Sequence, residues 1–141
     1  MAVIDADGLI LGRLSTQVAK RLMSGEDIVI VNAEKAIVSG NKVQLLAHYK
    51  NRRERGTRNH GPFYPRSADM ILKRTVRGML EHRKPSGRTA YRRLKVYVGV
   101  PREFRAEKAE IIDVAKKPEM YKYTTLGAIA KELGSTREVR T

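Results

Sequence analysis

The spacing of apolar residues changes from the period of a strand to that of a helix near the N-terminus. Residues 2–5 form a short apolar run that ends at Asp7-Gly8, a turn sequence. From Leu11 to about Leu22, apolar residues recur at intervals of three and four, which predicts an amphipathic helix. The β-branched run at 28–31 predicts a strand buried on both faces. This order predicts a βαβ unit with two parallel strands and a right-handed crossover.

A second helix is expected to begin at Asn41, because Asn is a favourable N-cap and Gln44 follows three residues later. Its apolar side ends at Tyr49. Residues 50–58 are highly charged, and a further turn of the helix is open there, although it would have nothing apolar to bury. The Gly- and Pro-containing residues 59–65 predict an extended loop.

A third helix is expected to begin after Ser67 and to run to Leu80. Its apolar residues, Met79 among them, follow a spacing of three and four and are expected to face the core, with the cationic residues on the opposite side. Residues 81–93 then predict a second basic loop. Both basic loops combine high charge with few apolar groups, so we expect them to become ordered only on a binding partner.

The C-terminal part adds one strand and one helix. Residues 94–98 alternate between apolar and polar and predict a strand. Thr124 or Thr125 starts a last helix, and Gly134 ends it. Residues 136–141 predict a frayed polar tail. The length of 141 residues and this order of elements predict one α/β domain over residues 1–141.

Positive charge is concentrated in the middle of the chain. Residues 50–93 hold 14 Lys or Arg against three acids, so they carry +11 of the formal net charge of +14. Eleven of these cations are arginines, which bind phosphate through two parallel hydrogen bonds and also stack on bases. A charged face that only keeps a protein in solution usually intersperses both signs. The pattern therefore predicts a polyanionic partner, with nucleic acid as the first hypothesis.

Composition and spacing exclude several other classes of site. The absence of cysteine excludes disulfides, thiolate metal sites and cysteine nucleophiles. No run approaches the length of a membrane span, and the start lacks a signal-peptide pattern, which predicts an intracellular protein. Gly8 and Gly12 lie between a strand and a helix but lack the G-x-G-x-x-G spacing, and the three histidines lack metal-ligand spacing. We expect no cofactor, no metal and no small-molecule substrate.

RNA is a better match than DNA for the basic segments. The chain has neither a zinc finger nor a basic region followed by heptads. Long basic loops that contain Gly and Pro suit an irregular RNA surface, and His60 and Tyr64 could stack on bases or donate hydrogen bonds there. Three hypotheses follow: a structural ribonucleoprotein component, an RNA-processing enzyme or chaperone, and a nucleotide-binding α/β enzyme at Gly8 and Gly12.

Several blocks of sequence resemble the universal ribosomal large-subunit protein family thirteen, in the order and approximate spacing of that family. They cover nearly the whole chain and are specific when taken together. The sequence of residues 74–79 is similar to that of the archaeal and eukaryotic branch. Glu81 departs from the family pattern, in which a small residue or proline is expected at this position. The blocks are Val3-Ile4-Asp5-Ala6, residues 8–14, 30–35, 38–42 and 76–80, Gly87-Arg88, and residues 94–101, 123–126 and 132–134.

The resemblance implies a three-layer α/β fold around a four-stranded parallel sheet flanked by helices. It also implies a non-catalytic, cytoplasmic protein of the ribosome that binds large-subunit rRNA, lies against other large-subunit proteins and supports subunit assembly. Together with the charge pattern, it leads us to expect RNA contacts from the cations of residues 50–93 and from two loop side chains. These residues are Lys50, Arg52, Arg53, Arg55, Arg58, His60, Tyr64, Arg66, Lys73, Arg74, Arg77, Arg83, Lys84, Arg88, Arg92 and Arg93.

Overall fold

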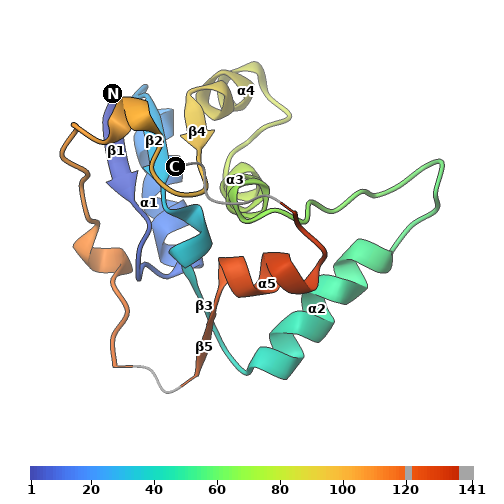
Figure 1. Cartoon of the computed structure of the whole chain (residues 1–141). Coiled ribbons are helices and arrows are strands. Elements are labelled where there is room, and N and C mark those ends of the chain that lie inside the picture. Colours follow the sequence, from blue (N-terminus) through green and yellow to red (C-terminus); the bar gives the residue numbers. More distant parts are fainter. Residues whose placement is uncertain (120–121, 137–141) are drawn as a thin grey trace.

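A parallel sheet of three strands forms the centre of the computed structural model, which describes residues 1–119 and 122–136 (Figure 1). The strands β1 (Ala2–Asp5), β2 (Ile28–Val31) and β4 (Leu94–Val96) lie in the order β1-β2-β4. Helix α1 (Leu11–Met23) connects β1 to β2, which pair in parallel, as the βαβ pattern predicts. The predicted frayed tail lies, apart from Thr136, outside the described residues.

The two faces of this sheet are covered differently. On one face, isoleucines of β1 and β2 pack with α1, α3 (Ala68–Met79) and α5 (Leu126–Glu132) in one apolar core. On the other face, Val3, Val29 and Val31 pack against Phe104 of the short 3-10 helix η2 (Arg102–Phe104). All four residues of β2 are buried, as their β-branched run predicts. In the described residues, helices thus cover one face, and a short irregular segment replaces the expected second helical layer.

The sheet has three parallel strands in the described part of the chain, not the expected four. At the free edge of β1, one residue, Glu110, occupies the place of a further strand. Its N–H donates to the carbonyl of Val3 (2.8 Å), and its carbonyl accepts from the N–H of Asp5 (3.0 Å). The pairing stops there because residues 105–108 are all exposed and charged or small, so they have no apolar face to lay on either core.

A second, two-stranded sheet was not predicted. Strands β3 (Ile37–Ser39) and β5 (Tyr123–Thr125) pair antiparallel, although each has only three residues and no clear alternation. The chain passes from β2 to β3 through the 3-10 helix η1 (Ala33–Lys35), and a third such helix, η3, spans Asp113–Ala115. Thr125 caps α5 through its side chain, which accepts from the N–H of Ala128, so the predicted start of the last helix is confirmed.

The prediction of a loop over residues 81–93 was wrong, because this segment contains helix α4 (Pro85–Arg92). Gly87 and Ala90 are its buried residues, and both are small. A Cβ atom on Gly87 would overlap the backbone carbonyl of Glu81, so α4 lies directly against the preceding turn. Close packing through small side chains gives almost no hydrophobic periodicity, which explains why the helix escaped prediction.

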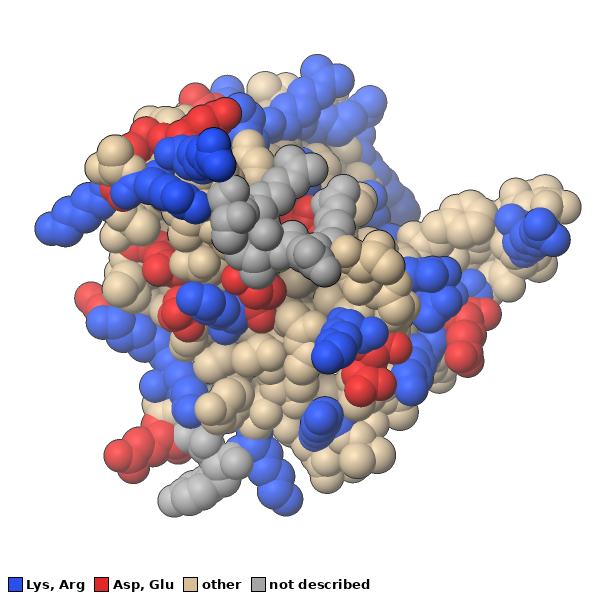
Figure 2. Space-filling view, in the orientation of Figure 1, with Lys and Arg blue, Asp and Glu red and all other residues tan. Residues whose placement is uncertain are grey.

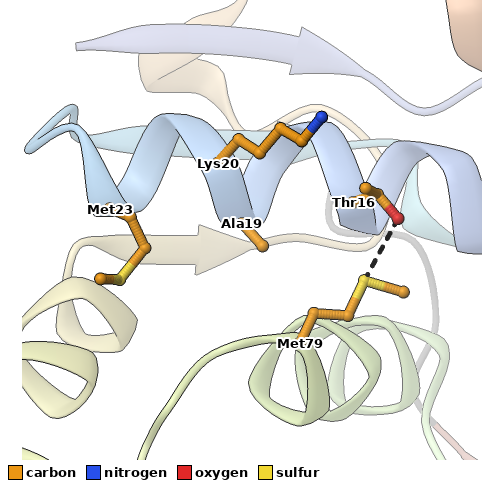
Figure 3. A pocket seen from close by; sticks show the side chains of 5 residues that line it. All are labelled: Thr16, Ala19, Lys20, Met23 and Met79. Atoms are coloured by element: carbon orange, nitrogen blue, oxygen red, sulfur yellow. Dashed lines mark hydrogen bonds between the residues drawn. The ribbon is translucent and has the colours of Figure 1, made fainter.

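Met79 also differs from its prediction, because its side chain is 43% exposed rather than part of the core. It lies at the edge of a shallow groove of about 510 Å³ between α1 and α3, across from Thr16 and Met23 (Figure 3). The other apolar residues of the stripe, among them Ile71, Leu72 and Val76, are buried as expected, whereas Thr75 is half-buried. None of the helices in the described residues is both long and apolar enough to cross a membrane.

Candidate nucleic-acid interface

Helix α2 and the chain after it project from the body of the molecule (Figure 1). Helix α2 (Lys42–Glu54) begins at Asn41, whose side chain accepts from the N–H of Val43, as the predicted cap requires. We call residues 55–67, which connect α2 to α3, the arm. Lys and Arg side chains lie along α2 and the arm and at its tip (Figure 2). The arm holds no acidic residue, and Arg55, Arg58, His60 and Arg66 are all exposed.

Tyr64 lies at the root of the arm between two arginines. The guanidinium carbon of Arg74 lies 4.7 Å from the centre of the Tyr64 ring, and that of Arg52 lies 5.6 Å away. Tyr49, which is buried, contacts the same ring at a centroid distance of 6.1 Å. An arginine stacked on a ring by its face keeps the N–H groups at its edge for hydrogen bonds. One terminal nitrogen of Arg52 also lies 3.5 Å from the Tyr64 hydroxyl, and one of Arg74 lies 3.5 Å from the Phe63 carbonyl. This arrangement therefore holds two guanidinium groups at the root of the arm and leaves their other N–H groups available for phosphate.

A second tyrosine links α3 to α4. The ammonium of Lys73 lies 5.2 Å from the centre of the Tyr91 ring. Burial raises the pKa of Tyr91, while the positive charges of Arg77 and Arg74 lower it, so both arginines act on the same phenol. In the part of the chain that the structure describes, Lys73, Arg74 and Arg77 form no ion pair. The ion pairs of the described residues therefore leave these three charges unneutralised.

These contacts join α2, the root of the arm, α3 and α4 into one surface, which we call the basic face. Tyr64 connects the arm to α3, and Tyr91 connects α3 to α4. Cations that are far apart in the sequence thus lie around two aromatic rings. The basic face consists of Arg52, Tyr64, Lys73, Arg74, Arg77 and Tyr91.

Some of the predicted site residues lie beside the basic face and also make contacts within the protein. Arg53 donates to the carbonyl of Leu133 at the end of α5 (2.9 Å), so it connects α2 to α5. Lys84 pairs with Glu81 (2.7 Å), which raises the pKa of Lys84. Arg88 donates to the carbonyl of Arg83 (3.0 Å), which fixes its side chain over the turn before α4. Lys50, Arg92 and the half-buried Arg93 complete the predicted set.

Among the described residues, three cations outside residues 50–93 are paired with acids. Arg21 forms a bidentate pair with Glu26 and also contacts Glu110. Lys35 pairs with Asp7, and Lys116 pairs with Asp113. The charge of residues 50–93 differs from the rest of the chain in amount, since the other residues together carry only +3.

Gly8 and Gly12 show no sign of a phosphate-binding loop. Gly8 has a φ of +69°, a conformation that favours glycine, and its N–H donates to the carbonyl of Lys35 (3.4 Å). That N–H is therefore already bonded to η1. Gly8 is therefore a turn residue, as interpreted, whereas Gly12 lies inside α1 and is not a turn residue.

Two aromatic residues of this region were missed by the sequence prediction. Tyr91 was missed because its helix was not recognised. Phe63 was missed because its neighbours His60 and Tyr64 carry polar groups and were chosen first. Aromatic residues interleaved with arginines were the available signal, since single-stranded RNA is bound by aromatic rings that stack on bases and by cations that contact the backbone.

Comparison with known proteins gives the family. The model of the ribosomal protein L13 family matches residues 1–103. The chain belongs to the ribosomal protein L13 family. The chain is 51% identical to the large ribosomal subunit protein uL13 of Methanosarcina barkeri and 49% identical to that of Methanococcoides burtonii, in each case over 96% of this chain and 99% of the relative. The uL13 protein of Methanopyrus kandleri is 41% identical over 94% of this chain and 86% of its own length. These matches confirm the predicted family. All three relatives are archaeal, which agrees with the predicted archaeal and eukaryotic branch.

Proposed function

We propose that this chain is a structural, non-catalytic constituent of the large ribosomal subunit in the cytoplasm. As one RNA-binding domain, it binds large-subunit rRNA, contacts neighbouring large-subunit proteins and supports assembly of the subunit. The observation that carries the RNA-binding role is the basic face, where Lys73, Arg74 and Arg77 have no acidic partner in the described residues. Membership of the L13 family supports the ribosomal role.

In this proposal, the basic face, the arm and α4 make different contacts with the RNA. The basic face holds the RNA backbone, because its guanidinium and ammonium groups are fixed in place before RNA arrives. The arm reaches farther from the body, and α4 extends the contact on the other side of α3. Arg53 takes part mainly by holding α2 to α5. The other proposed contacts are Lys50, Arg55, Arg58, His60, Arg66, Arg83, Lys84, Arg88, Arg92 and Arg93.

Salt dependence of RNA binding tests this proposal. For about 6–10 phosphate contacts, affinity for large-subunit rRNA stripped of its proteins should fall on the order of 10³–10⁵-fold between about 50 and 200 mM salt. Replacing Lys73, Arg74 and Arg77 together by Ala should flatten the salt slope by about three units, one per lost contact. The matched control replaces Lys116 and Lys117, which lie outside residues 50–93, and should leave the slope unchanged. An unchanged slope in the triple variant would place the RNA surface elsewhere.

A role as an RNA-processing enzyme or chaperone makes a different prediction. Such a protein would cleave, modify or refold its RNA and then release it, whereas a structural component stays bound. We expect the purified protein to leave rRNA chemically unchanged after prolonged incubation. We also expect the protein in a cell lysate to sediment with the large subunit in a density gradient. Turnover of RNA by the pure protein would favour the enzyme instead.

A further inference from the structure

Phe63 is an exposed aromatic residue of the arm, and packing within the fold does not account for it. Its side chain is 72% exposed, whereas the neighbouring Tyr64 is half-buried under Arg74 and Arg52. One edge of the Phe63 ring lies close to Gly61, where an added Cβ atom would be 3.1 Å from two ring carbons. The rest of the ring faces solvent in a segment that carries only positive charge.

The arm is held in a defined turn before any partner binds. The backbones of Thr57 and Gly61 exchange two hydrogen bonds of 3.2 and 3.0 Å. The N–H of His60 donates to the hydroxyl of Thr57 (3.2 Å). Gly56 lies so close to Gly61 that no Cβ atom fits between them. Because the turn is fixed, binding through the Phe63 ring would need little further ordering of the backbone.

Arg74 ties Phe63 to the basic face. One terminal nitrogen of Arg74 lies 3.5 Å from the carbonyl oxygen of Phe63, while its guanidinium stacks on Tyr64. The exposed ring is thus joined through its own backbone to a cation placed for phosphate. A nucleotide offers these two features together, a flat apolar base and an anionic phosphate.

We infer that Phe63 is a stacking platform for an unpaired nucleobase of the RNA, an inference that rests on the proposed function. The base must be unpaired because the bases of an RNA helix are stacked on one another and cannot reach a side chain by their faces. A phenyl ring has no hydrogen-bonding group, so it selects an unstacked base without selecting its identity. Phe63 thereby gives the arm a preference for a loop or bulge, which phosphate contacts alone do not give.

Substitution of Phe63 tests the inference in binding to protein-free large-subunit rRNA. Phe63→Ala should weaken binding by about 5- to 150-fold, the range for loss of one stacked base. The salt slope should stay unchanged because no charge is lost. Phe63→Tyr should restore binding, since it keeps the ring, whereas Phe63→Leu should not, since it is apolar without a flat face. The control is Val43→Ala, which removes an apolar side chain of similar exposure (74%) from α2 and should have no effect.

The outcomes separate failure of this inference from failure of the proposed function. Thermal unfolding should be unchanged in every Phe63 variant, because the side chain is exposed. Salt-dependent binding by the wild type together with equal affinity of Phe63→Ala would overturn the stacking role alone. Full rescue by Phe63→Leu would also overturn it, in favour of an apolar contact with the RNA that needs no flat ring. Ultraviolet cross-linking should join the arm to an unpaired nucleotide, and a cross-link within a helix would contradict the inference. If the wild type binds no rRNA, the proposed function itself fails.

Discussion

Gly87→Ala is expected to destabilise the protein, although alanine is the better helix former. An added Cβ atom would overlap the carbonyl oxygen and carbon of Glu81 and lie 3.0 Å from the backbone nitrogen of His82. All three obstacles are backbone atoms, which cannot rotate away as the end of a side chain can. Helix α4 would therefore have to move away from the turn that precedes it.

The size of the effect follows from two opposing contributions. Forcing an extra carbon into a packed site costs about 1–3 kcal/mol. Replacing Gly by Ala inside a helix contributes at most about 1 kcal/mol in the opposite direction. Because the obstacles are backbone atoms, the cost lies in the upper part of the first range. We therefore expect a net loss of about 1–2 kcal/mol in the free energy of unfolding, or a decrease of roughly 3–8 °C in Tm.

Gly78→Ala is the matched control in α3. It is also a helical glycine, but nothing lies within 4 Å of its added Cβ atom. Without a clash, only helix propensity acts, so stability should rise by up to about 1 kcal/mol. Thermal and urea unfolding followed by circular dichroism measure both variants. The reasoning is refuted if Gly87→Ala unfolds at or above the Tm of the wild type.

The remaining predictions concern the core, an ion pair and local stability. Ile71→Ala should cost about 2–5 kcal/mol in unfolding free energy, because Ile71 is fully buried. Arg77→Ala should leave Tm nearly unchanged but weaken RNA binding. Equal losses of stability in both variants would mean that the two faces of α3 are assigned the wrong way round. Glu26→Gln should lower stability by no more than about 1 kcal/mol near neutral pH. The hydrogen bonds from Arg21 lower the pKa of Glu26 below its ordinary value of 4.5. The stability difference between wild type and variant should therefore disappear as the pH falls from 4.5 through the lower pKa of the folded protein. A stability difference that persists in acid would exclude the ion pair as its cause. Amide hydrogen exchange of the free protein should show protection in α4 and at the hydrogen-bonded N–H groups of Thr57 and Gly61. Fast exchange in α4 would contradict its packing against the turn.

Local pattern was sufficient for those elements that have a strong periodicity or a clear cap. The run Ile28–Val31 predicted a strand buried on both faces, and β2 is buried at every position. Asn41 and Thr125 predicted helix starts, and both side chains accept a backbone N–H there. The cationic side of α3 was also predicted, since the buried stripe leaves Lys73, Arg74 and Arg77 no other direction. Each of these features depends on residues close together in the chain.

Features that depend on distant contacts could not be predicted in this way. Helix α4 exists because Gly87 lets it approach the backbone of Glu81, and β3 pairs with a strand more than eighty residues later. Met79 follows the periodicity of the core, yet it lies at the edge of α3 where α1 leaves a groove. Periodicity gives the direction of a side chain on its own helix but not how far the neighbouring helix extends over it.

The sequence by itself determined that residues 50–93 carry an excess of cations and that the chain resembles the L13 family. The tertiary structure decided which of those cations act together. It placed Tyr64 between Arg52 and Arg74, joined Lys73 to Tyr91, and turned Arg53 toward the end of α5. Net charge is a sum over residues and needs no coordinates. Stacking and pairing act over a few ångströms, so they depend on which helices the core brings side by side.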